Sequence, residues 1–546
     1  MQAAEKGDWT HAEADFERAL RANPRDADAQ NALGQLLLQQ GKVDAAIVHL
    51  RAVTRLRPNL AIGHLYLAQA LSQKGTLDGA IVELRATVRL APQQPQAHEA
   101  LARALATQQK TAEAIAEMDK AVELAPNQPE LRDEAGSLHA QNKDYLAAES
   151  QFRAALGLNP NYEPALLHLG VALIEEQKAA EARPFLEKAV QVNPNDGLAH
   201  YYLGNISETE QRPEAALQEY KQAAKLTPDF VPLRTRLGIL AQRAGDIPTA
   251  VESFRAIIAA QPNDPEAHND LGLALLQSVQ VDEAIREFQK AIALSPNDVS
   301  FRNNLGAAYL QKTDFDAAIQ QYKDALKIAP ANAELHYNLG LAYKLKDDIP
   351  SAIAELQRCI TADPNLPDPH YTLGVTLWQT GKFDEAAQQL NDVIRLKPDY
   401  AEAYYTLGTV YKQAGNLPGA AQALKKAIEL QPDFAGAHTT LAAVLRQQGD
   451  TAGAAAESKL GAEITQQKMT QQAATFATNS GMKLMNAGDL DGAIAQFESA
   501  ISHDPDYAPA HQQLGTALER KGDKDRAQKE METAQQLLAK KTAPSH

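Results

Sequence analysis

Hydrophobic positions along this chain recur with the 3.6-residue period of an α-helix rather than the strict alternation of a β-strand. Around residue 374, the residues at i, i+3, i+4 and i+7 are His370, Leu373, Gly374 and Leu377. A similar stripe follows on the next segment, at Ala386, Leu390 and Val393. Each stripe covers one side of a helix, so this stretch predicts two amphipathic helices that pack against each other.

Turn and breaker residues separate the predicted helices. Gly381 lies between the two stripes, where a left-handed backbone is easiest for glycine. Pro398 cannot continue a helix and therefore ends the second one. Asp or Asn often follows, placed to cap the next helix. Four copies open on proline, which suits a first helical turn, at Pro95, Pro129, Pro265 and Pro367.

The same punctuation repeats every 34 residues. Thirteen prolines keep this spacing without a slip: Pro24, Pro58, Pro92, Pro126, Pro160, Pro194, Pro228, Pro262, Pro296, Pro330, Pro364, Pro398 and Pro432. Glycine stands 24 positions before ten of them, and Ala68 and Ala102 replace it twice, so this position demands a small side chain. Such a period predicts an array of stacked repeats, because no repeat can bury its stripe alone.

With these residues the chain resembles the tetratricopeptide repeat (TPR) family, whose unit of about 34 residues is a pair of helices. The resemblance covers almost the whole chain. It implies an all-α fold, a right-handed superhelical α-solenoid of stacked antiparallel helix pairs. It also implies that the first helix of each repeat lines a concave face. Because architecture defines the family, the resemblance implies protein-protein interaction but no particular partner.

The spacing predicts the following organisation. Residues 1–26 form a truncated repeat, in which residues 1–6 are the tail of a first helix and Asp8 to Ala22 are the second helix. Residues 27–468 form thirteen full repeats, residues 474–541 form two more, and residues 542–546 are a tail. If Met1 is the true start, the array simply begins frayed and a cytoplasmic location is expected. If the natural chain extends upstream with an export signal, a periplasmic or envelope location is expected.

The repeat loses its register within residues 451–487. Gln466 stands where proline belongs, and Met469 to Ala473 is a five-residue insertion. The surrounding residues are good helix formers, so a long helix, straight or kinked near Gly461 or Gly481, is expected to join the two arrays. Five extra residues turn a helix by about 140° net, which predicts that the last two repeats are rotated out of register.

Composition excludes or disfavours several classes of function and site, although it does not identify the function. The 546 residues carry a formal net charge of -16, which argues against nucleic acid, because phosphates need a Lys/Arg surface. No apolar run approaches the about 20 residues of a membrane helix, and the first residues do not resemble a signal peptide. Cys359 is the only cysteine, so an internal disulfide and a four-cysteine zinc site are excluded.

Candidate chemistry is weak. Eight histidines share one repeat position: His64, His98, His200, His268, His336, His370, His438 and His511. Packed helices lie about 8–10 Å apart, too far to share an ion held at about 2.0–2.1 Å, so these rings are expected to fill a seam between paired helices. Cys359 takes the place of a small packing residue. We therefore predict no catalytic, cofactor or metal site, and an enzymatic function is disfavoured.

The variable residues of the first helices are the predicted binding residues. Between Pro265 and Leu460 these form rows: tyrosines beside amides and threonines, cations and a tryptophan on one margin, and acids on the other. Asn can both donate to and accept from a peptide backbone, and Tyr is favoured at interfaces. The predicted peptide-binding residues are Asn304, Tyr337, Asn338, Lys344, Tyr371, Thr372, Trp378, Tyr405, Thr406, Lys412 and Arg446. The acidic margin is Glu334, Asp368 and Glu402.

The sequence thus predicts a non-catalytic scaffold or adaptor that binds an extended peptide or a partner protein in its groove. The alternatives are an envelope or secretion assembly factor that acts by the same binding, and a structural protein that self-associates through its end repeats. Some TPR proteins hold a C-terminal carboxylate with a clamp of Lys, Asn and Arg residues spread over three repeats, and no three consecutive repeats of this chain carry that set. Removing Tyr371 and Asn338 together is expected to weaken binding by about 2 kcal/mol with little change in melting.

Overall fold

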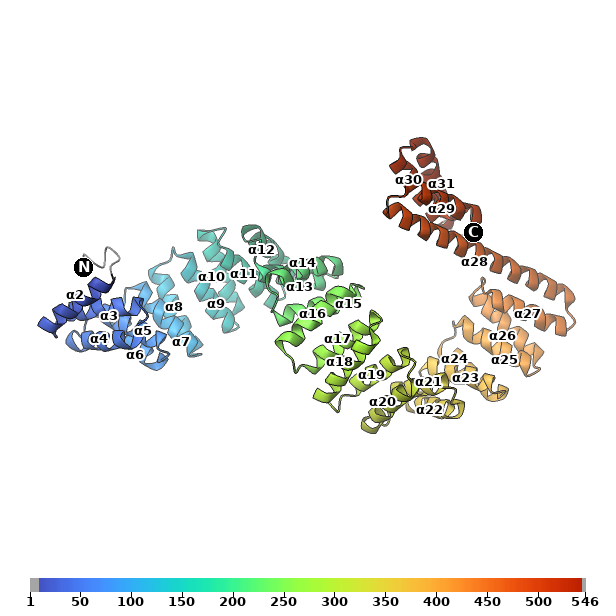
Figure 1. Ribbon diagram of the computed structural model, residues 1–546, viewed down its shortest axis with the longest axis horizontal. Coiled ribbons are helices and arrows are strands. Elements are labelled where there is room, and N and C mark those ends of the chain that lie inside the picture. Colours follow the sequence, from blue (N-terminus) through green and yellow to red (C-terminus); the bar gives the residue numbers. More distant parts are fainter. Residues whose placement is uncertain (1–8, 543–546) are drawn as a thin grey trace. The chain divides into compact units, whose positions relative to one another are not determined.

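The computed structural model describes residues 9–542, and the side chains of residues 11–539 (Figure 1). This part of the chain contains thirty helices and no strand, so the predicted all-α class is confirmed. The chain divides into two compact bodies, an N-terminal body (Met1–Leu294) and a C-terminal body (Ser295–His546). The predicted tail of a first helix at residues 1–6 lies outside the described residues.

Antiparallel helix pairs succeed one another in the N-terminal body. Its helices are α2 (Trp9–Ala22), α3 (Ala27–Gln39), α4 (Val43–Leu56), α5 (Ala61–Gln73), α6 (Leu77–Leu90), α7 (Pro95–Thr107), α8 (Thr111–Leu124), α9 (Pro129–Gln141), α10 (Tyr145–Leu158), α11 (Glu163–Glu175), α12 (Ala179–Val192), α13 (Gly197–Thr209), α14 (Pro213–Leu226), α15 (Val231–Arg243), α16 (Ile247–Ala260), α17 (Pro265–Gln277) and α18 (Val281–Leu294). From α3 to α27, odd-numbered helices are the first helices of their repeats and even-numbered helices are the second.

The C-terminal body continues the same alternation up to one long helix. Its helices are α19 (Val299–Gln311), α20 (Phe315–Ile328), α21 (Ala333–Leu345), α22 (Ile349–Ala362), α23 (Pro367–Gln379), α24 (Phe383–Leu396), α25 (Ala401–Gln413), α26 (Leu417–Leu430), α27 (Ala435–Gln447), α28 (Thr451–Asn486), α29 (Leu490–His503), α30 (Ala508–Lys521) and α31 (Lys524–Thr542).

Packing at the repeated glycine explains why the position must be small. A Cβ added to Gly374 on α23 would lie 3.1 Å from Cγ of Leu390 on α24. At Gly272 the added Cβ would lie only 2.6 Å from a ring carbon of Phe288. The two helices of a repeat therefore approach each other across the glycine, and the larger partner side chain fills the place of the missing one.

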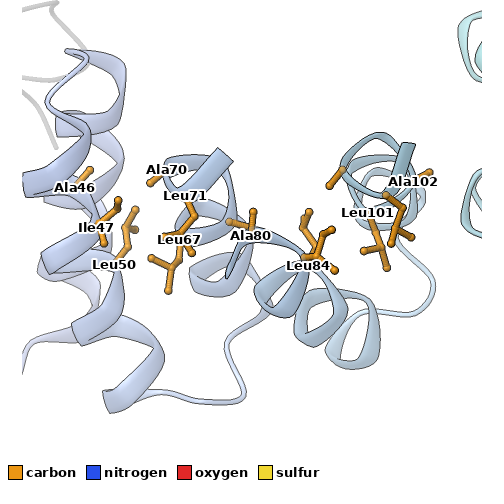
Figure 2. Packing of buried hydrophobic residues seen from close by; sticks show 14 of the residues in the cluster. Ala46, Ile47, Leu50, Leu67, Ala70, Leu71, Ala80, Leu84, Leu101 and Ala102 are labelled. Atoms are coloured by element: carbon orange, nitrogen blue, oxygen red, sulfur yellow. The ribbon is translucent and has the colours of Figure 1, made fainter. Parts of the chain in front are cut away.

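Leucine, isoleucine and alanine side chains form the core between successive helices. In the N-terminal body this core is continuous from α4 to α7 (Figure 2). Leu50 on α4, Leu67 on α5 and Leu84 on α6 are each at most 3% exposed, and each is buried by helices of its own and a neighbouring repeat. Since alanine brings helices close and leucine fills the gaps, few aromatic residues are needed.

The turn between the helices of a repeat passes through the left-handed region, as predicted for Gly381, whose φ is +78°. Several repeats place another residue there, including Val279 with φ +62° and Thr313 with φ +63°. A β-branched residue rarely adopts this conformation. The packing of the two flanking helices therefore imposes the turn, even where the local sequence disfavours it.

The shared histidines lie in the seam between paired helices. In seven repeats Nδ1 lies 2.5–2.7 Å from the carboxylate of a glutamate 19 residues later, on the second helix. In most of them Nε2 also lies 2.9–3.1 Å from the carbonyl oxygen of the proline that precedes the repeat. Each ring thus ties its first helix to its own second helix and to the end of the previous repeat.

A single helix spans the segment where the repeat loses its register. α28 has 36 residues, and no loop interrupts it between Thr451 and Asn486 (Figure 1). Its first part packs on α27, where a Cβ on Gly461 would lie 2.9 Å from Oγ1 of Thr439. Its last part packs on α29, where a Cβ on Gly481 would lie 2.5 Å from the ring of Phe497. α28 therefore serves as the second helix of one repeat and the first helix of the next.

Candidate peptide-binding face

The predicted binding residues all lie on first helices of the C-terminal body. α19 carries Asn304, and α27 carries Arg446. The remaining nine are shared by the three helices between them: Tyr337, Asn338 and Lys344 on α21, Tyr371, Thr372 and Trp378 on α23, and Tyr405, Thr406 and Lys412 on α25. We call the surface made by these residues, together with Asn303, Thr440 and the acidic margin, the first-helix face.

Hydrogen bonds join the middle of this face from one repeat to the next. Nδ2 of Asn338 donates to Oδ1 of Asn303 over 2.9 Å. The hydroxyl of Tyr337 lies 3.3 Å from Oγ1 of Thr372. Each bond spans 35 residues, so it connects a first helix with the first helix of the following repeat. We call this series of bonds the ladder.

The next rung joins Tyr371 to Thr406, whose hydroxyl oxygens lie 3.2 Å apart. Oγ1 of Thr406 already donates to the carbonyl oxygen of Glu402 over 2.8 Å, so Tyr371 donates and Thr406 accepts. The Tyr371 ring is half-buried against the hydrophobic core and lies 5.4 Å from the ring of Tyr400. This packing disagrees with the expectation that Tyr371 can be removed with little change in melting.

The ladder stops at α25. The Tyr405 hydroxyl and Oγ1 of Thr440 would form the next rung, and among the described residues neither makes a hydrogen bond that continues the series. The Tyr405 ring instead packs on Phe434, with centroids 4.7 Å apart. Two polar groups therefore lack a hydrogen-bond partner among the described residues at the end of the ladder.

The cations of the face also lack partners. We call Lys344, Trp378, Lys412 and Arg446, which share one repeat position, the cationic margin. Within the part of the chain that the structure describes, no carboxylate pairs with the side chains of Lys344, Lys412 or Arg446. Lys344 is half-buried, and this burial lowers its pKa. Between the lysines stands Trp378, whose Nε1 donates to Oε1 of Gln413 over 2.7 Å and whose ring packs on the core. The margin therefore offers separated positive charges around an aromatic ring.

The acidic margin lies at the other end of the same helices. Oε1 of Glu334 accepts a hydrogen bond from Asn303 over 3.0 Å, while the side chains of Asp368 and Glu402 are exposed. Burial, the neighbouring Tyr371 and the nearby carboxylates raise the pKa of Tyr400. The face as a whole thus carries negative charge on one side, neutral groups in the middle and positive charge on the other.

Sequence reasoning missed the residues that support the face from the next repeat. Gln413 orients the indole of Trp378, while Tyr400 and Phe434 lie under the rings of Tyr371 and Tyr405. A signal was present, because aromatic residues recur in the turns before first helices at Tyr400 and Phe434. Their contacts with the preceding repeat could not be read without the packing.

Two cavities of the C-terminal body lie elsewhere. One of about 770 Å³ is lined by α20, α21 and α22 and includes His336 and Arg358. Another of about 740 Å³ lies between α24, α25 and α26 and includes Tyr404 and Tyr411. Neither contains a residue of the first-helix face. The first-helix face therefore lies outside both of these cavities.

Other reactive groups have packing roles. The Cys359 thiol is buried, and burial raises its pKa to about 11, which disfavours the nucleophilic thiolate. Nowhere among the described residues do three potential ligands from His, Cys, Asp and Glu gather around a point that could hold a metal ion. No described helix is long and apolar enough to cross a membrane.

Helix pairs stacked in this way define a helical-repeat protein of the kind that binds other proteins. TPR models match residues 2–61, 65–129, 139–206 and 484–541, and a model of the "Cilia and flagella-associated protein 70 C-terminal domain", also of TPR type, matches residues 208–478. The chain belongs to the tetratricopeptide repeat family. It is therefore a protein-interaction scaffold by family and architecture, and this family is typically non-catalytic.

Several solved structures are similar to parts of the chain. YrrB, described as "a TPR protein with an unusual peptide-binding site", is 26% identical, covering 34% of this chain and 97% of its own, with a TM-score of 0.31. MamA is 30% identical, covering 30% of this chain and 96% of its own, with a TM-score of 0.29. Yeast Tom70 is 17% identical, covering 77% and 96%, with a TM-score of 0.35. No curated protein sequence matches the chain.

Proposed function

We propose that the first-helix face of the C-terminal body binds an extended segment of a partner protein, and that the protein acts as a non-catalytic adaptor. The observation that carries this proposal is the end of the ladder. Tyr405 and Thr440 keep unused polar groups there, on the same two helices as the unpaired Lys412 and Arg446. Buried or half-buried polar groups are normally satisfied, so a set left open on one surface favours a ligand.

The shape of this face supports a peptide rather than a small molecule. Its residues are spread over five successive first helices, from Asn304 on α19 to Arg446 on α27. Packed helices lie about 8–10 Å apart, so five of them span roughly 32–40 Å. An extended chain covers this length with about twelve residues. The ladder holds the neighbouring first helices together, which lowers the cost of presenting one continuous surface.

The proposal is tested with peptides selected from a random library on the full-length protein. Dissociation constants of the selected peptides are then measured for the wild type and for the double variant Tyr405→Phe with Lys412→Ala. Both changes remove groups without a partner in the protein, so the fold should be unaffected. We expect binding to weaken about tenfold or more, equivalent to about 1.4 kcal/mol.

Adjacent residues supply the matched control. Tyr404 also lies on α25 but lines the cavity between α24 and α26, and Lys425 is exposed on α26. The control variant Tyr404→Phe with Lys425→Ala should bind the selected peptides as the wild type does. Selected peptides that bind the Tyr405→Phe and Lys412→Ala variant as tightly as the wild type would show that the binding site is elsewhere.

A further inference from the structure

We propose that the segment bound by the first-helix face carries acidic side chains at three-residue spacing around one apolar residue. Along the cationic margin the order of contacts is acid at Lys344, apolar at Trp378, acid at Lys412 and acid at Arg446. This inference rests on the proposed function and adds the chemistry of the ligand to it.

Charge is the first argument. The chain has 69 acidic and 53 basic residues, yet Lys344, Lys412 and Arg446 lack an acidic partner among the described residues. Two residues beyond Lys344, Lys346 is paired with Asp316 of the preceding repeat, although it is more exposed. Because acids are abundant, three cations left unpaired at one repeat position favour an anionic partner from outside.

The acidic margin lies too far along the same helices to form ion pairs with the cationic margin. Asp368 and Glu402 stand at the second position of their helices, while Lys412 stands at the twelfth. Ten residues of helix separate these positions by about 15 Å, far beyond ion-pair distance. A carboxylate from a ligand would supply the missing partner, and it would also compensate the burial of Lys344, which lowers the pKa of that lysine.

Spacing is the second argument. The ladder bonds show that neighbouring first helices lie side by side, and packed helices lie about 8–10 Å apart. A polyproline II segment has three residues per turn and rises about 3.1 Å per residue, so every third side chain faces the same way after about 9.3 Å. Such a segment therefore presents one side chain to each repeat along the cationic margin.

The tryptophan fixes where the apolar residue falls. Trp378 occupies the repeat position that holds lysine or arginine in the flanking repeats. Its only indole donor is already used by Gln413, so the half-buried ring offers a ligand apolar surface alone. A carboxylate at this contact would lose water without gaining a cation. An apolar side chain loses nothing polar and gains contact with the ring.

The test uses four synthetic peptides of the same length with the full-length protein, measured by fluorescence anisotropy. EPSLPSEPSE carries the proposed spacing, and EPSEPSLPSE carries it for the opposite chain direction. EEEPSLPSPS has the same composition with the acids together, and QPSLPSQPSQ lacks the charges. We expect one of the first two peptides to bind at least tenfold more tightly than the last two. We also expect added salt to weaken that binding.

Variants then locate the contacts. Lys412→Gln with Arg446→Gln should weaken the tight peptide at least tenfold, and Trp378→Ala should weaken it similarly. Arg55→Gln with Arg89→Gln removes the same charge from exposed second-helix positions of the N-terminal body and should change binding less than twofold. If Lys412→Gln with Arg446→Gln leaves the affinity unchanged, the inference is wrong.

The outcomes separate this inference from the proposed function. Equal affinity for the acidic and glutamine peptides, both weakened by Tyr405→Phe with Lys412→Ala, overturns the acidic motif and leaves peptide binding at the face supported. Library-selected peptides that depend on the face but lack spaced acids overturn the motif in the same way. Selected peptides indifferent to every variant of the face overturn both.

Discussion

The two bodies join successive first helices in different ways. In the N-terminal body, several of these contacts are ion pairs between neighbouring repeats. Arg103 bonds Glu134 over 2.8 Å, and Arg236 bonds Glu208 over 3.0 Å. In the C-terminal body the ladder joins neutral groups, as between Tyr371 and Thr406.

This difference shows how one repeat pattern supports two kinds of surface. Ion pairs between repeats, such as those of Arg103 and Arg236, use charges that would otherwise be open to a ligand. Neutral bonds connect the C-terminal repeats equally well and leave the cations of α21, α25 and α27 unpaired. The distinction lies in which groups remain after neighbouring repeats have bonded, since the helix pairs are alike in both bodies.

The largest loss of stability is expected from substitutions of the repeated glycine, and this loss should differ in size between the two bodies. Gly272→Leu in the N-terminal body places new atoms against the rigid ring of Phe288, while Gly374→Leu in the C-terminal body meets the more adaptable Leu390. We expect Gly374→Leu to cost about 1–3 kcal/mol of stability and Gly272→Leu to reach or exceed the upper end. Urea unfolding of both full-length variants, with hydrogen exchange to localise the effect, measures this. Equal costs would show that the aromatic partner does not matter.

The ladder should give a smaller effect, confined to the C-terminal body. Tyr371→Phe removes the donor to Thr406, whose side chain is buried, and should cost about 1 kcal/mol. Tyr405→Phe removes a hydroxyl without such a bond and should cost close to nothing. Faster amide exchange in α23 and α25 of Tyr371→Phe, and not of Tyr405→Phe, is the expected readout. Identical behaviour of the two variants would mean that the ladder contributes nothing to stability.

The smallest effect concerns pH and belongs to the N-terminal body. Nδ1 of His168 lies 2.9 Å from Oδ1 of the buried Asp133. Burial of the ring opposes its charge, but the bond to Asp133 and the nearby carboxylates outweigh it, so the pKa of His168 is raised. A raised folded-state pKa means that the pair's stabilisation is fully present below about pH 6.5 and is lost as pH rises through the folded pKa.

Unfolding at two pH values checks this sign. The stability lost in His168→Gln, relative to the wild type, should be larger near pH 5.5 than near pH 8.5. The loss in Tyr371→Phe should be the same at both, because its ladder bond involves no group that titrates there. A pH-independent loss in His168→Gln would contradict the proposed role of the Asp133 pair.

Much of the fold could be predicted, because the same local sequence features recur in successive repeats. The stripe around Leu373, the glycine at Gly374 and the left-handed turn at Gly381 are local features, and all were found as expected. The turn at Val279 shows the limit of local reasoning, since a β-branched residue adopts the same left-handed φ. There, the docking of two helices outweighs the preference of one residue.

The histidine seam could have been read more fully from the sequence. His336 faces Glu355 and His370 faces Gln389, each 19 residues later. In the first full repeat the pair is exchanged, with Gln30 facing His49. Such exchange between two fixed positions indicates contact, and the repeats provide it within a single chain.

The sequence by itself determined that this protein is a stack of TPR helix pairs, because helix period, close approach and turn are encoded within each stretch of 34 residues. Only the tertiary structure decided which polar groups remain open. Asn338, Tyr371 and Lys412 are alike in sequence as variable residues of first helices, yet the first two bond to neighbouring repeats and the third does not. The physical reason is that such bonds depend on side-chain reach and direction between helices 35 residues apart, which local periodicity does not encode.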